Sequence, residues 1–171
     1  MKVTHIILAA AALLLTMATA AQAADTDKPM VSYTTAAGEQ TPIDFTYLTG
    51  SGTATGKLVD AVTITATGTW TSAQVDYLTY ALKGVEGDTF YGSVENATLT
   101  AADLGNATLS GTGTFYFSNM FMKCTALTTV TLPAGGVASA TVSFQYAFKG
   151  CAKLTSVANL DRFTTASNFS D

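Results

Sequence analysis

A segment of this chain occurs twice, and this repeat limits the folds that the chain can adopt. Residues 117–130 are echoed by residues 144–157 at a constant offset of 27 residues. The identical pairs are Phe117/Phe144, Phe121/Phe148, Cys124/Cys151, Leu127/Leu154, Thr128/Thr155 and Val130/Val157. Only one of these pairs is Thr, so the Thr-rich composition does not explain the match. A fixed period of 20–50 residues is typical of stacked architectures, in which each unit buries its apolar side against its neighbours.

The first residues have the features of a secretory signal peptide. Lys2 is the positive start, Ile6–Leu15 is apolar, and Ala21–Ala23 offers small residues for cleavage. A membrane anchor is the alternative, but the apolar stretch is shorter than the roughly 20 residues that a spanning helix needs. We therefore assign residues 1–23 to a cleaved signal peptide, and we expect a secreted or cell-surface protein with no transmembrane segment in the mature chain.

Charge and composition exclude several function classes. Without the signal peptide the chain has seven Lys and Arg against twelve Asp and Glu, a formal charge of −5. This balance argues against a nucleic-acid partner. The single His, His5, lies within the signal peptide, so the mature chain lacks the commonest general base and the commonest metal ligand. We expect no enzyme activity, no metal and no cofactor.

Residues 24–56 read as lead-in strands followed by a Gly/Thr-rich linker. Short apolar alternations predict strands at Val31–Tyr33 and Ile43–Leu48. We expect the second of these to form a hairpin with Leu58–Ile64. Gly50–Gly56 is glycine-rich and predicts a flexible turn or linker between them.

Residues 57–95 predict an N-terminal cap and a connector. The alternation in Val62–Thr67 is typical of a strand with one buried face. A helix should follow, because Thr71 and Gln74 form a capping-box pattern and Gly84 can end the helix. Trp70, between the two, should cover one end of the core. The helical face that we expect to be buried contains Val75, Leu78, Ala81 and Leu82.

Each repeat should contain a short strand and a helical turn. Val130 and Leu132 should point inward and Thr129 and Thr131 outward, with Pro133 ending the strand. The preceding Phe and Cys residues have a one-sided helical spacing, which predicts a short helical turn. Stacking should place Phe121 on Phe148 and Leu127 on Leu154. The expected repeat core is Phe117, Phe121, Cys124, Leu127, Val130, Leu132, Phe144, Phe148, Cys151, Leu154 and Val157.

A weaker third copy precedes the two clear ones. Leu99–Leu104 aligns with Leu127–Leu132 at an offset of 28, with Ala102 in place of Val130. The smaller side chain predicts an edge repeat, or a place where the cap packs closely. Near the other end, Phe169 begins a further copy that stops at Asp171. The chain is therefore either a fragment of a longer protein or ends in a frayed half-repeat.

The segments 120–133 and 147–157 resemble the BspA-like leucine-rich repeats of bacterial surface proteins, whose units combine Phe, Cys and Leu at three-residue intervals with an aliphatic strand. This resemblance implies a β-rich α/β fold, namely a leucine-rich-repeat solenoid. It would have two clear repeats and one weak repeat within residues 96–171, the last incomplete, and an N-terminal strand–helix cap. It also implies adhesion or protein contact, and no catalytic residues.

Cys124 and Cys151 occupy the same position in successive repeats. A metal site would lack its other ligands, and a catalytic thiol would lack a histidine base. Two interpretations remain open, namely buried apolar thiols and a disulfide between neighbouring repeats.

The candidate binding face consists of the outward strand positions of successive repeats: Asp103, Thr129, Thr131 and Ser156, with Ala101 and Ala158. It is small, polar and nearly uncharged. A partner there would be a protein, from a host or a neighbouring cell surface, or a glycan; a merely solvated face is the alternative. A second functional hypothesis is a structural subunit of a surface layer or fibre, which self-associates through its open C-terminal end.

Overall fold

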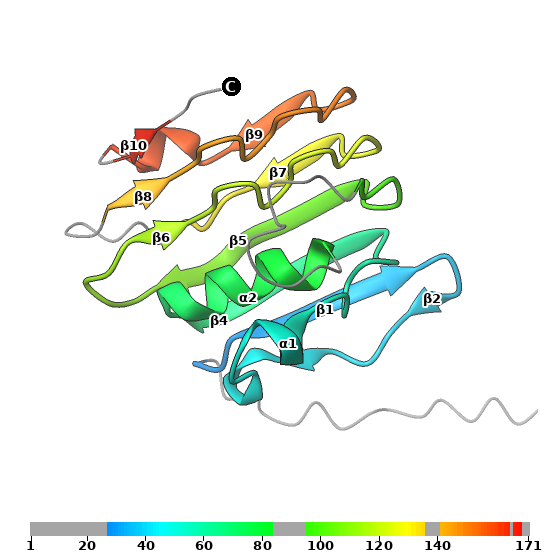
Figure 1. Ribbon diagram of the computed structural model, residues 1–171, viewed down its shortest axis with the longest axis horizontal. Helices are drawn as coiled ribbons and strands as arrows, with labels where there is room; N and C mark the ends of the chain where they lie inside the picture. Colours follow the sequence, from blue (N-terminus) through cyan, green and yellow to red (C-terminus); the bar gives the residue numbers. More distant parts are fainter. Residues whose placement is uncertain (1–26, 84–94, 136–140, 165, 169–171) are drawn as a thin grey trace, which may run out of the picture.

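The computed structural model describes residues 27–83, 95–135, 141–164 and 166–168 of the 171-residue chain. Over these ranges the protein is a mixed α/β structure with many strands and few helices (Figure 1). The predictions for the signal peptide, the helix end at Gly84, most of the connector and Phe169 concern residues outside the described ranges. None of the helices in the described part is long and apolar enough to span a bilayer.

The larger sheet extends across the whole molecule (Figure 1). Its order is β2 (Gly38–Glu39), β1 (Met30–Thr35), β4 (Thr63–Trp70), β5 (Ala101–Leu109), β7 (Thr129–Thr131) and β9 (Ser156–Ala158). A further strand, β3 (Ile43–Asp44), pairs with β1. Strand β1 is antiparallel to its neighbours, whereas β4, β5, β7 and β9 are parallel to one another.

The predicted hairpin between Ile43–Leu48 and Leu58–Ile64 is wrong. Strand β4 pairs instead with β1, over five residue pairs that include Val31 opposite Ala66. Both strands alternate with the same period, so this pairing buries Val31, Ile64 and Ala66 on one face, with 0–2% of each side chain exposed. Strand β1 pairs with β3 over only two residue pairs. Its longer pairing is therefore with β4.

The segment predicted as a flexible turn or linker, Gly50–Gly56, contains a short helix that is followed by a turn. Residues 45–54 fold into a 3-10 turn, η1 (Phe45–Tyr47), and a short helix, α1 (Ser51–Ala54). Asp44 caps η1, because its carboxylate accepts a hydrogen bond from the Thr46 amide at 2.8 Å. The side chains of Phe45 and Ala54 are fully buried. Their burial provides the apolar contacts that a linker would lack.

Helix α2 (Ser72–Lys83) begins where the capping pattern predicts. The Gln74 side chain accepts a hydrogen bond from the Thr71 amide at 2.8 Å. All four residues of the predicted apolar face are buried. Val75 and Leu78 face side chains of β4 and β5, including Ala66 and Leu104, across a small apolar void. Trp70, which is 2% exposed, packs against Phe45 at a ring-centroid distance of 5.0 Å.

The repeated segments lie side by side in two sheets. In the larger sheet Ala102 pairs with Val130 and Val130 with Val157, at the offsets of 28 and 27. The smaller sheet contains β6 (Phe115–Tyr116), β8 (Val142–Ser143) and β10 (Ala166–Asn168), all parallel. In the larger sheet β5 lies between β4 and β7. It is therefore an interior strand and not the edge that Ala102 suggested. Ala102 instead occupies the position where the sheet meets the N-terminal half.

The segments between the two sheets form turns, so the predicted helical turn is wrong. The amides of Met120 and Cys124 donate to the carbonyls three residues earlier, at 3.1 and 2.9 Å. Asn119 and Lys123 adopt positive φ values of 60° and 58°, which a right-handed helix does not allow. The aromatic rings nevertheless stack as expected: the Phe121 and Phe148 centroids lie 5.9 Å apart.

Three threonines, each directly before a strand, join successive repeats through hydrogen bonds and form a ladder. The hydroxyl of Thr100 donates to the carbonyl of Val62, that of Thr128 to Thr100, and that of Thr155 to Thr128. Each of these distances is 2.9 or 3.0 Å. The backbone amide of each threonine donates to the same carbonyl at 2.8 to 2.9 Å. The repeated Leu-Thr dipeptide therefore fixes the register of the stack through two hydrogen bonds per repeat.

Burial of the repeat core decreases towards the last repeat. Seven of the core residues are at most 2% exposed: Phe117, Phe121, Cys124, Leu127, Val130, Leu132 and Phe144. The other four are only partly buried: Phe148, Cys151, Leu154 and Val157. A further short turn, η3 (Leu160–Arg162), follows β9. Phe163, next along the chain, packs edge-on against Phe117 and Phe144.

Candidate binding face

The register of the larger sheet brings the predicted face residues together in two rows. Thr129 lies between Ala101 and Ser156 in the first row. Thr131 lies between Asp103 and Ala158 in the second. The side chains of Asp103, Thr129 and Ser156 are exposed, and that of Thr131 is half-buried. Because alternate strand residues point to opposite faces, all six lie on the side facing away from α2.

Two further strands extend the face, and these were missed from the sequence. Thr63 of β4 pairs with Ala101, and Thr65 pairs with Asp103. On the other side of β4, Thr34 and Ser32 of β1 continue the same two rows. The hydroxyls of Thr34 and Thr63 are hydrogen-bonded at 2.7 Å. The alternating threonines of β4 were visible in the sequence, but the pairing partner that puts them in the same rows was not.

Asp103 is held in position by an irregularity within β5, where the pairing with β4 shifts register. Its carboxylate accepts a hydrogen bond from the Gly105 amide at 2.8 Å. A Cβ atom at Gly105 would lie 3.0 Å from this carboxylate and 3.0 Å from the Thr131 side chain, so any other residue here would push these two side chains aside. The packing of Gly105 beside Thr131 also explains why Thr131 is less exposed than Thr129.

A hollow of about 340 Å³ lies at the β1 end of the face. It is lined by hydroxyl residues of the β1 and β4 rows together with Tyr33, Glu39, Gln40 and Pro42. The face therefore consists of a flat hydroxyl-rich strip that ends in a shallow polar depression. Hydroxyls both donate and accept hydrogen bonds, so the face is suited to a ligand that is polar and uncharged.

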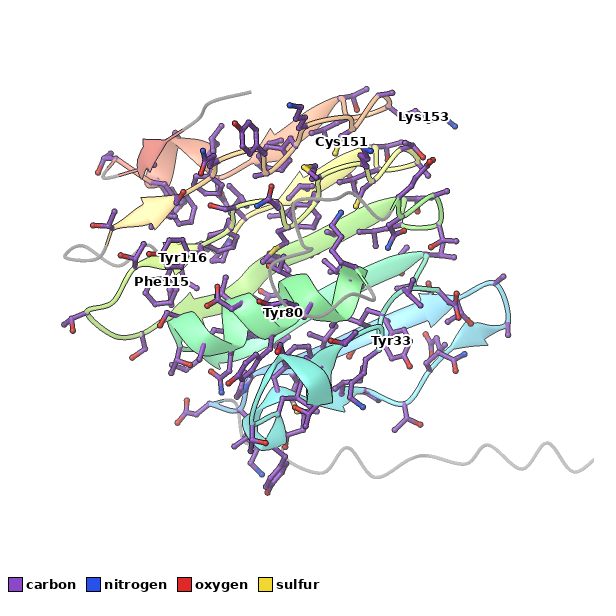
Figure 2. The ribbon with its side chains drawn as sticks, in the orientation of Figure 1. Tyr33, Tyr80, Phe115, Tyr116, Cys151 and Lys153 are labelled. Atoms are coloured by element: carbon purple, nitrogen blue, oxygen red, sulfur yellow. The ribbon has the colours of Figure 1, made fainter. Side chains whose placement is uncertain are left out.

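The two cysteines are free thiols, which agrees with the first of the two interpretations. Cys124 is fully buried, and burial raises the pKa of its thiol to about 11. Cys151 is half-buried, and burial also raises its pKa. The Cys151 thiol donates a hydrogen bond to the Phe121 carbonyl at 2.9 Å. Figure 2 shows Cys151 and Lys153 in the last repeat, near β9 and away from Tyr33 on β1.

The pKa values of two ionisable groups on α2 are also shifted, and no sequence pattern pointed to either group. Lys83 is only 4% exposed, and desolvation lowers the pKa of its ammonium group. Desolvation raises the pKa of the Asp76 carboxyl to about 6. A lysine in the last turn of a helix is a common pattern on exposed helices as well, so its burial could not be predicted.

Among the residues that the structure describes, no three His, Cys, Asp or Glu side chains lie close enough together to hold a metal ion. No protein-family model, no curated protein and no solved structure matches this chain.

Proposed function

We propose that this protein is a secreted or surface-exposed, non-enzymatic leucine-rich-repeat solenoid of the BspA-like kind, which binds a protein or a glycan through its outer sheet face. The observation that carries the proposal is the register of β5, β7 and β9. Outward residues 27 or 28 positions apart, all of them small or polar, lie in two continuous rows. A stacked repeat converts a short sequence pattern into an extended surface, which is how such proteins generally bind.

The size of the face predicts weak binding by a single molecule. Five strands from β1 to β9 extend over about 19 Å, given a strand spacing of about 4.8 Å, and the two rows lie about 7 Å apart. This area is well below the roughly 800 Å² per partner of a standard protein interface. The two rows also contain none of the Trp, Tyr and Arg anchors that dominate binding energy. We therefore expect function to depend on many copies displayed on one surface.

The test is a binding assay with a matched pair of double variants. The purified chain, displayed on beads, would be tested on arrays of glycans and of immobilised extracellular proteins. Thr129→Lys with Thr131→Lys places two charges on the face, whereas Ser110→Lys with Thr112→Lys places two charges on an exposed loop outside it. We expect the first variant to lose the binding of the parent and the second to keep it. Equal binding by both variants would reject the face as the binding site.

A second function, assembly into a layer or fibre, is favoured by the incomplete burial of the last repeat. Leu154 and Val157 are partly exposed, whereas Leu127 and Val130 at the equivalent positions are at most 1% exposed. Within the described residues β9 is also an edge strand, paired only with β7. Sedimentation over a range of concentrations tests this hypothesis. Association that Val157→Lys abolishes would support it, and a monomer at every concentration would exclude it.

A further inference from the structure

The end of α2 reaches into the turn of the first clear repeat through one buried lysine. Lys83 is the last residue of α2 and is 4% exposed. Its Nζ donates a hydrogen bond to the Met122 carbonyl and lies 3.8 Å from the Cys124 Sγ. Lys83 and Cys124 are 41 residues apart in the sequence. An amine and a thiol are thus enclosed together where the N-terminal half meets the repeats.

Burial makes the amine a better nucleophile than an ordinary lysine. Desolvation is the largest influence on Lys83 and lowers its pKa; the two thiols, Cys124 and Cys151, oppose this shift, the charge of Lys123 adds to it, and the net shift is downward. In the part of the chain that the structure describes, none of the groups that shift the pKa of Lys83 is a carboxylate. A larger fraction of the amine is therefore neutral at a given pH than in a lysine exposed to water. A desolvated neutral lysine carries the free electron pair that nucleophilic chemistry requires.

The geometry also separates the two thiols. The Cys151 thiol hydrogen is directed to the Phe121 carbonyl. Cys124 is the sulfur in contact with the Lys83 amine, and its thiol is protonated at neutral pH because burial raises its pKa to about 11. Once oxidised to a sulfenic acid, this sulfur would be an electrophile with an amine already beside it.

We propose that Lys83 and Cys124 form an oxidative cross-linking site, in which a peroxide converts the amine–thiol contact into a covalent sulfur–nitrogen bond. The Lys83 amine beside Sγ first takes the thiol proton, because the thiolate is the form that a peroxide oxidises. The peroxide then transfers one oxygen to Sγ of Cys124, giving a sulfenic acid, and the hydroxide that it releases takes the proton back from Lys83 to form water. The Nζ lone pair of Lys83 then attacks the sulfur. The hydroxyl group leaves with one amine hydrogen as a second water. The sulfur is oxidised by two electrons, and the protein loses two hydrogens in total.

Such a bond would fasten α2 to the first clear repeat. It would close a loop of 41 residues that contains the connector and strands β5 and β6. A cross-link restricts the unfolded chain more than the folded one, so we expect the melting temperature to rise by about 10 °C. This inference does not depend on the proposed binding face, and failure of either leaves the other standing.

The experiment treats the purified full chain with hydrogen peroxide and follows its mass and its thiols. We expect the loss of two hydrogens, the loss of one alkylatable thiol, and a proteolytic fragment that joins Lys83 to Cys124. Excess dithiothreitol should reverse all three changes. The same treatment of the chain unfolded in guanidinium should give no such fragment, because the two groups are then far apart.

Three variants separate the cross-link from its alternatives. Lys83→Arg keeps the charge but removes the reactive amine, and Lys83→Met serves if the arginine variant does not fold. Either should abolish the product, whereas Cys151→Ser should retain it. Loss of the two hydrogens that requires Cys151 would identify a disulfide and overturn the proposal. Oxygen addition at Cys124 without a joined fragment would overturn it as well.

Discussion

Glycine at position 123 should make the protein more stable than alanine does, although glycine has no side chain. Lys123 adopts a φ of 58°, in the left-handed region. The equivalent position of the next repeat, 27 residues later, is occupied by Gly150 with a φ of 78°. The turn therefore requires a left-handed residue, and the last repeat supplies the residue type for which this conformation is least costly.

The expected gain follows from two opposing effects. A side chain in the left-handed conformation costs about 1–2 kcal/mol. Glycine loses about 0.5–1 kcal/mol more than alanine on folding, because its unfolded chain is freer. Lys123→Gly should therefore be about 0.5–1 kcal/mol more stable than Lys123→Ala, which corresponds to a rise in melting temperature of about 1–4 °C. Comparison with alanine removes the effect of losing the charge near Lys83, because both variants lose it.

Lys153 is the matched control. It is exposed in the turn that follows the one containing Gly150, and it does not have a positive φ. There Lys153→Gly should be about 0.5–1 kcal/mol less stable than Lys153→Ala. Urea titration of the four variants measures the two differences. If glycine is less stable than alanine at both positions, the left-handed strain at Lys123 is absent and the equivalence of the two turns is refuted.

Three further predictions concern the ladder, the core and one carboxyl group. Thr128→Val should cost about 0.5–1 kcal/mol in urea titration because a hydrogen bond is lost, whereas Thr129→Val on the same strand should stay within about 0.5 kcal/mol; equal effects would contradict the ladder. Phe121→Ala should cost about 3–5 kcal/mol, and Phe148→Ala roughly half as much, because its ring is less buried; equal costs would show that the last repeat is covered. The folded state prefers protonated Asp76, so stability should fall as pH rises from about 4, its usual pKa, to about 6. Asp76 is half-exposed, so Asp76→Asn should raise the free energy of unfolding at pH 7 by only roughly 1 kcal/mol. If the melting temperatures of the variant and the parent change with pH in the same way, this prediction is contradicted.

The repeat made much of the second half predictable. An offset of 27 residues with identical side chains specifies which residues stack, and strand alternation specifies that Val130 points inward and Thr129 outward. Both follow from local periodicity, which a sequence displays directly. The turns were less predictable, because Phe117, Phe121 and Cys124 have a spacing that a helix and a pair of successive turns can both satisfy. Only the backbone angles of the intervening residues distinguish the two.

The N-terminal half could not be predicted as well, since its pairing is long-range and does not repeat. A strand at Ile43 could pair with the strand after it or with the strand before it. Loop-closure entropy changes only slowly with loop length, so sequence separation does not decide between these. The extent of burial decides. Strand β1 matches the alternation of β4 over five residue pairs, whereas it pairs with Ile43 and Asp44 over only two. This choice placed Ser32 and Thr34 on the candidate face.

The threonines of the repeats fall into two groups with different roles. Thr100, Thr128 and Thr155 donate their hydroxyls to the carbonyl of the preceding strand, so these side chains stabilise the stack. Thr129 and Thr131 make no side-chain hydrogen bond within the described part of the chain, and they point away from the core. A strand favours a β-branched residue at these two positions but has no need of a hydroxyl, since valine would pair and pack as well. If Thr129→Val with Thr131→Val leaves stability unchanged but abolishes binding on the arrays, the hydroxyls serve a partner; if binding is also unchanged, the face is merely solvated.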